Sequence, residues 1–154
     1  MYKIKFQTLS VNHILLGILF FTFCIRILIF NQSLNYQNHY LTGDTQSYHD
    51  TALSWINTGS FSLSLDYIDI PETVRTPGYP CFLGIIYKVF GEGYRPVILV
   101  QIFLSLLSIY FIYLIGNSLL DYRLGLIAAI LFSLDPLTIS MNYKILTETL
   151  FLFL

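Results

Sequence analysis

Charged side chains are scarce in this chain. Only 11% of its 154 residues are Asp, Glu, Lys or Arg, whereas a typical soluble domain carries about 25%. Hydrophobic residues make up 55%, and the mean hydropathy is +0.66. The net charge of −1 gives no sign of a nucleic-acid partner. A chain with this balance is expected to have the lipid bilayer as its partner and solvent.

Cysteine is equally scarce. Cys24 and Cys81 lie far apart, and Cys24 sits within an apolar run, where a thiol behaves as a small hydrophobe. Two such cysteines provide neither a metal-ligand spacing nor a disulfide framework. The chain also lacks a small-residue cleavage site after its first apolar run, which argues against a secretory signal peptide.

Long apolar runs are what the sequence does contain. A membrane-spanning helix needs about 20 residues, and three runs approach or reach that length: 13–30, 96–116 and 124–141. Asp135-Pro136 interrupts the third, where we expect a kink or the exit of the helix. From Glu148 about seven residues remain, a rise of ~10 Å that cannot cross a bilayer. We therefore expect the chain to end inside a helix. Either the gene is broken, or the chain is a piece of a larger protein.

The predicted fold class is an all-α polytopic membrane protein, with about three complete transmembrane helices and the start of a fourth. Lys3 and Lys5 predict that the N-terminus lies in the cytoplasm. The expected location of the protein is the inner (plasma) membrane. The predicted segments follow in order: 1–12 cytoplasmic, 13–30 first span, 31–95 outer loop, 96–116 second span, 117–123 cytoplasmic turn, 124–141 third span, 142–147 outer turn and 148–154 start of the fourth span.

The outer loop is long enough to have structure of its own. Two helices are predicted in it, near 45–57 and 80–90. Asp44 is placed as the N-cap of the first, and Gly59 marks its end. Its apolar face carries Tyr and Trp at helical spacing, so we expect this helix to lie along the membrane surface. The second is too short to span a bilayer and is interpreted as another interfacial helix.

Three acids of the outer loop, Asp66, Asp69 and Glu72, recur every three residues. Their loop setting, without a nearby histidine, favours a solvated acidic stretch over a metal site. The sequence therefore predicts no metal-ligating residues here.

Arg26 is unusual because an arginine at the membrane centre costs about 2.5–3.5 kcal/mol. It lies about one turn from the end of its helix, so one interpretation is that it reaches the outer surface. The alternative is that it faces the helix bundle and contacts a ligand or a carboxylate.

The order of several motifs is familiar. The motifs are Gly43-Asp44-Thr45, Arg75-Thr76-Pro77-Gly78-Tyr79-Pro80, Phe90-Gly91, a helix with Gln101, a turn with Arg123, Leu134-Asp135-Pro136 and Leu146-Thr147-Glu148-Thr149-Leu150-Phe151. Over nearly the whole chain, this order resembles the N-terminal third of GT-C glycosyltransferases of the protein-mannosyltransferase and aminoarabinose-transferase type.

The resemblance implies a membrane enzyme of the cell envelope that moves a sugar from a polyprenyl-phosphate donor to an acceptor at the outer face. The essential acid of the family's first outer loop maps onto Asp44, and a second acid maps onto Glu148. Arg26, Arg75 and Lys144 are candidates for holding the donor phosphate. The sequence leaves open the sugar, the acceptor, the oligomeric state and the use of a divalent metal ion.

Simpler roles compete with each assignment. Asp44 could only cap its helix, worth ~1 kcal/mol, and Glu148 could only compensate a helix dipole. Arg75 and Lys144 could meet solvent or lipid headgroups. For the whole chain, the alternatives are a transporter, flippase or polysaccharide polymerase, and a non-catalytic scaffold or inert product of a truncated gene.

Overall fold

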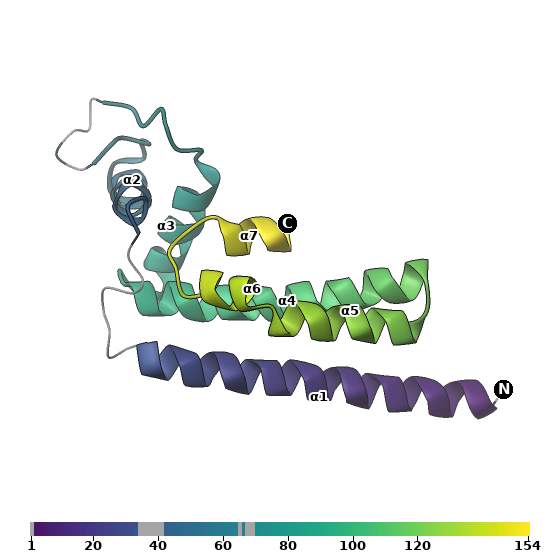
Figure 1. The fold of residues 1–154 in the computed structure, drawn as a ribbon. Coiled ribbons are helices and arrows are strands. Elements are labelled where there is room, and N and C mark those ends of the chain that lie inside the picture. The colour runs from purple at the N-terminus through teal and green to yellow at the C-terminus, as the bar shows by residue number, and fades with distance from the viewer. Residues whose placement is uncertain (1, 34–41, 65, 67–69) are drawn as a thin grey trace.

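The computed structural model describes residues 2–33, 42–64, 66 and 70–154, with side chains from Val11 onward. Its regular structure within these ranges is entirely helical (Figure 1). The nearest approach to a strand there is an isolated antiparallel bridge between Ser62 and Pro71. The predicted all-α class is therefore confirmed.

Two helices are long and apolar enough to cross a membrane, among the residues that the structure describes. Helix α1 (Tyr2–Ser33) contains a candidate span at Val11–Ser33, and helix α4 (Tyr94–Leu119) is a candidate over its full 26 residues. Pro96 lies in the first turn of α4, where its missing N–H has no helical partner to lose.

The run predicted as one span at 124–141 is two helices, α5 (Tyr122–Leu134) and α6 (Pro136–Met141). Asp135 separates them in an extended conformation because a residue before proline is driven out of the helical region. Its carboxylate accepts the Thr138 N–H at 2.8 Å and so caps α6. With 13 residues α5 is only about 20 Å long, shorter than the ~30 Å hydrocarbon core.

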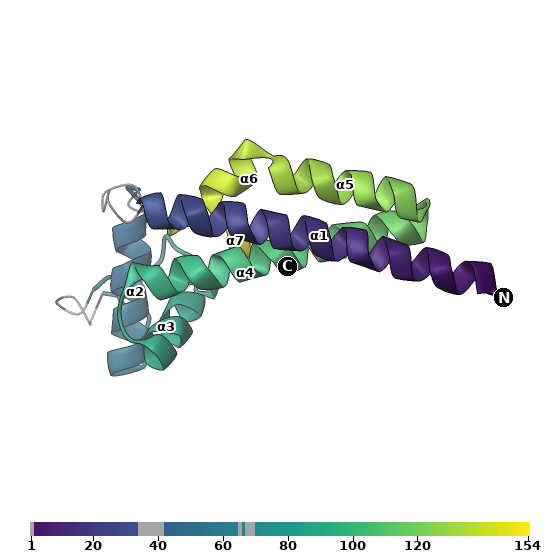
Figure 2. The same cartoon turned by 90° about the horizontal axis from the view of Figure 1, so that it is seen from below.

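Helices α1, α4 and α5 run side by side and form the long part of the molecule (Figures 1 and 2). In its N-terminal half, α1 presents buried apolar side chains to the other two, which places one core between these helices. That core consists of Val11, Leu15, Ile109, Tyr113, Leu126 and Ala129.

Helices α4 and α5 approach each other most closely at two glycines. A Cβ atom on Gly116 would lie 2.7 Å from the Cα of Gly125, and one on Gly125 would lie 2.8 Å from the Tyr113 carbonyl oxygen. Small residues allow such approach between helices. Asp121 starts α5 by accepting the Leu124 N–H at 2.8 Å, so a short capped turn joins the pair.

Helices α2 (Thr45–Thr58) and α3 (Gly78–Phe90) pack together at one end of the molecule, with α2 lying across the direction of the long helices (Figures 1 and 2). Tyr48 and Ala52 of α2 are buried. A Cβ on Gly84 of α3 would lie 2.7 Å from the Trp55 ring, so α3 presses directly on this face.

The Tyr/Trp face of α2 is therefore not free to rest on a membrane surface, whereas the position of α2 along that surface stays a prediction. That face is covered by α3, because two short amphipathic helices bury each other's apolar sides. Helix α3 instead exposes Ile85, Val89 and Phe90. The last helix, α7 (Glu148–Phe153), returns along α4.

Replacing Gly116 or Gly125 by Ala should destabilise the protein by about 1–3 kcal/mol, because the added methyl meets backbone atoms that cannot move aside. The measurement is the unfolding midpoint in detergent. Gly17→Ala on α1 is the matched control, since nothing lies within 4 Å of its Cβ position. Equal stability of all three variants would contradict the close α4–α5 contact.

Candidate functional site

Asp44 does not cap α2. Its backbone is helical (φ −89°, ψ −19°) and its side chain makes no capping hydrogen bond, whereas an N-cap needs an extended backbone to reach the first turn. Its Oδ1 instead accepts a hydrogen bond from Nη2 of Arg75 in an ion pair. The capping interpretation is therefore wrong, and the carboxylate of Asp44 points toward the loop that carries Arg75.

Arg75 is held over the start of α2. Its guanidinium lies 5.1 Å from the centre of the Tyr48 ring, a cation–π distance. The hydrogen bond to Asp44 raises the pKa of Arg75, which keeps the guanidinium charged. Asp44 remains half-exposed, so one side of the pair is open to a ligand.

Glu72 positions the Arg75 loop. Its Oε1 accepts the N–H groups of Val74 and Arg75 at 2.7 and 3.0 Å, and Ser47 of α2 donates to Oε2 at 3.4 Å. This acid therefore shapes a loop. Asp69, its neighbour in the acidic series, lies outside the described residues.

Glu148 is the first residue of α7 and is half-buried. Its Oε2 atom is buried without a hydrogen-bond partner among the described residues. An unpaired buried carboxylate oxygen costs free energy, so this atom still lacks a partner in the described structure that would satisfy it. Its place at a helix start is also favourable for a negative charge.

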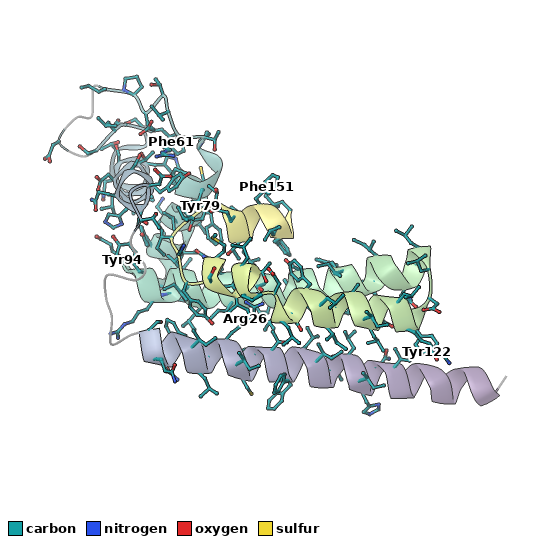
Figure 3. All side chains as sticks on the ribbon, in the orientation of Figure 1. Arg26, Phe61, Tyr79, Tyr94, Tyr122 and Phe151 are labelled. Atoms are coloured by element: carbon teal, nitrogen blue, oxygen red, sulfur yellow. The ribbon has the colours of Figure 1, made fainter. Side chains whose placement is uncertain are left out.

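Tyr79 of α3 lies beside Tyr48 and within electrostatic range of Glu148. Burial raises the pKa of its phenol, and the negative charge of Glu148 adds to the rise. Its ring meets the edge of Tyr48 at 5.0 Å between centroids, on the side of α2 that also holds Arg75. Figure 3 labels Tyr79 beside α7.

The segments that carry Asp44 and Glu148 touch directly. The hydroxyl of Thr45, next to Asp44, donates to the carbonyl oxygen of Ile145 at 3.4 Å. Ile145 lies three residues before Glu148 and is fully buried. Asp44, Arg75 and Glu148 are thus brought to the same end of the molecule.

Gln101 fixes the turn that leads to Glu148. It accepts a hydrogen bond from the Tyr79 hydroxyl at 2.9 Å and donates to the carbonyls of Lys144 and Asn142 at 2.9 and 3.3 Å. Sequence reasoning noted Gln101 within the motif order but gave it no role. The signal was present, because a glutamine in an uncharged apolar run needs partners inside the protein.

Arg26 is fully buried and faces the helix bundle (Figure 3). Its Nη1 donates to Oδ1 of Asn142, while Nε and Nη2 have no partner in the described part of the chain. The surface-reaching interpretation is therefore wrong, because the side chain points between helices rather than along its own. Among the described residues its side chain bonds an amide and not a carboxylate.

Asn142 connects Arg26 to α7. Its Nδ2 donates to the hydroxyl of Thr149 at 3.2 Å, and the Tyr143 hydroxyl donates to the Arg26 carbonyl at 2.8 Å. Sequence reasoning missed Asn142, since nothing local distinguishes an asparagine in a turn from a buried one.

Lys144 lies apart from Asp44, Arg75 and Glu148. Its side chain lines a groove beside α1 and α6. Within the ranges that the structure describes, no three His, Cys, Asp or Glu side chains lie close enough to hold a metal ion.

One family model matches this chain. It is described as dolichyl-phosphate-mannose-protein mannosyltransferase and covers residues 74–154, just over half of the sequence. The chain belongs to this family. The matched segment contains Arg75, Tyr79, Gln101 and Glu148, whereas Asp44 precedes it. Neither the curated proteins nor the solved structures gave a significant match.

Membership of the mannosyltransferase family confirms the GT-C resemblance. Together with the two long apolar helices, it supports a membrane glycosyltransferase function for the chain. It favours this function over the transporter, flippase or polymerase alternative.

Asn142→Leu should destabilise the protein by about 1.5–3 kcal/mol, since it removes a hydrogen bond to a buried charge. The double variant Arg26→Met/Asn142→Leu should recover much of that loss, because it removes the charge as well. Unfolding midpoints of the two single variants and the double variant measure the coupling. Strictly additive losses would show that Arg26 and Asn142 act independently.

Proposed function

We propose that this mannosyltransferase-family chain takes part in moving a sugar from a polyprenyl-phosphate donor to an acceptor at the outer face of the membrane. The observation that carries the proposal is the contact of Thr45 with Ile145, which brings the Asp44 and Glu148 segments together. In this proposal α2 and α3 lie at the outer surface of the inner (plasma) membrane, and the N-terminus is cytoplasmic.

Asp44 acts as the general base. It takes the proton of the acceptor's nucleophilic group as that group bonds to the anomeric carbon of the sugar. The bond from this carbon to the phosphate oxygen breaks, and its electron pair leaves with the phosphate. Base catalysis of this kind contributes roughly 10²–10⁴-fold in rate.

Arg75 binds the donor phosphate. A guanidinium can hold a phosphate through two parallel hydrogen bonds. In Arg75, Asp44 takes up the Nη2 nitrogen. A phosphate that reaches Arg75 therefore arrives next to the base. Support for this role comes from the partial exposure of both members of the pair.

Glu148 orients the sugar. The unpartnered Oε2 is an acceptor for a sugar hydroxyl, and the Gln101 hydrogen bonds hold the turn that precedes it. The carboxylate is thereby fixed relative to Tyr79 on the α3 side. Arg26 acts at a distance, by holding Asn142 and through it α7.

Asp44→Asn in the complete protein should lower transfer by at least about 10²-fold and leave membrane insertion intact, because the side chains are nearly isosteric. Transfer is measured with a polyprenyl-phosphate sugar. Asp50→Asn is the matched control. Asp50 also lies on α2, but it accepts a hydrogen bond from the Gln46 side chain rather than from an arginine.

Insertion of the Asp44→Asn variant is checked by labelling single cysteines from each side of the membrane. Label must reach the start of α2 and the turn before α7 from the same side. Full activity of Asp44→Asn, or labelling of these two segments from opposite sides, would contradict the proposed role of Asp44.

Glu148→Gln should reduce transfer per molecule of folded protein by about 10-fold or more, since the loss of one charge-assisted hydrogen bond costs about 1.5–3 kcal/mol. Glu92→Gln provides the control, because Glu92 pairs with His49 away from α7. If the protein level fell while the activity of the remaining protein stayed normal, Glu148 would have a structural role only.

A further inference from the structure

A groove lies between the end of α1 and the break that separates α5 from α6. Figures 1 and 2 both show α6 beside this part of α1. The groove has a volume of about 420 Å³, within the ~300–1,000 Å³ range of ligand sites. Its floor is apolar and consists of Ile29, Leu134, Pro136 and Ile139.

The groove changes character along its length. Ile29 lies within the candidate span of α1, and Ser33 is the last residue of that span. They are four positions apart, which corresponds to about 6 Å along the helix axis. Ser140, Tyr143 and Lys144 complete the lining, so the groove is apolar below the membrane boundary and polar near it.

Lys144 is the one charged residue among those that line the groove. No carboxylate in the described part of the chain pairs with it. A lysine close to a membrane surface contributes about 1 kcal/mol to the attraction of anionic lipids. Tyr143 is held by its hydrogen bond to the Arg26 carbonyl, which gives that side of the groove a fixed wall.

We propose that this groove binds an anionic glycerophospholipid, with an acyl chain on the apolar floor and the phosphate on Lys144. The proposed occupant is a resident lipid and not the sugar donor. The paired Asp44 and Arg75, to which sugar transfer is assigned, are not part of the groove. The inference is thus independent of the proposed catalytic roles.

The test uses the complete protein in nanodiscs that contain a phospholipid with a photoactivatable acyl chain. Phosphatidylglycerol is compared with phosphatidylcholine, and labelled peptides are identified by mass spectrometry. Labelling over 134–144 should favour phosphatidylglycerol by about fivefold, which corresponds to about 1 kcal/mol. Equal labelling by both lipids would refute the site.

Two pairs of variants separate the charge from the cavity. Lys144→Gln should remove the preference for phosphatidylglycerol, whereas Lys88→Gln, on the exposed side of α3, should keep it. Ser140→Phe should fill the groove and suppress labelling by both lipids, and Ser140→Ala should leave it unchanged. Retention of the preference in Lys144→Gln would overturn the assignment of the phosphate.

Competition with polyprenyl phosphate distinguishes a resident lipid from the donor. Excess polyprenyl phosphate should leave the labelling of 134–144 in place. One-for-one displacement of the label would instead make the groove part of the donor site and overturn the proposal. Loss of sugar transfer in Asp44→Asn has no bearing on this labelling, so the two proposals fail separately.

Discussion

The turn between α6 and α7 depends on the hydrogen bonds of Gln101. Backbone groups that leave a helix within or beside a bilayer must find partners inside the protein, because lipid offers none. Gln101 supplies such partners from the N-terminal third of the apolar helix α4, since it donates to two carbonyls of the turn. Tyr79 of α3 donates to the oxygen of the same amide. The buried Gln101 side chain therefore connects α3, α4 and the turn between α6 and α7.

Arg26 adds a second tie to the same turn. A buried guanidinium is costly unless it is hydrogen-bonded, and here it holds Asn142, which in turn holds Thr149 of α7. The start of α7 is thereby linked to α1 as well as to α4. Glu148 is positioned by these two ties, while its own Oε2 stays unpartnered within the described structure.

The crosswise pair of helices, α2 and α3, brings Asp44 to that turn. Burial of Tyr48 and Ala52 against α3, with Gly84 beneath Trp55, sets how α2 lies. The start of α2 then meets Ile145 through Thr45. Membership of the mannosyltransferase family is what led us to propose Asp44 as a base and Arg75 as a phosphate-binding group in this arrangement.

The sequence by itself determined the helical class and the places where helices break. Apolar runs of spanning length, Asp135 before Pro136 and the glycines after α2 and α3 act over a few residues, so local rules suffice for them. The partners of Asp44, Arg26 and Gln101 were decided only by the tertiary structure. They lie 31, 116 and 43 residues away, and α3 covers the face of α2 that its own sequence assigns to the membrane. Residues so distant in sequence meet only through helix packing, which local periodicity does not encode.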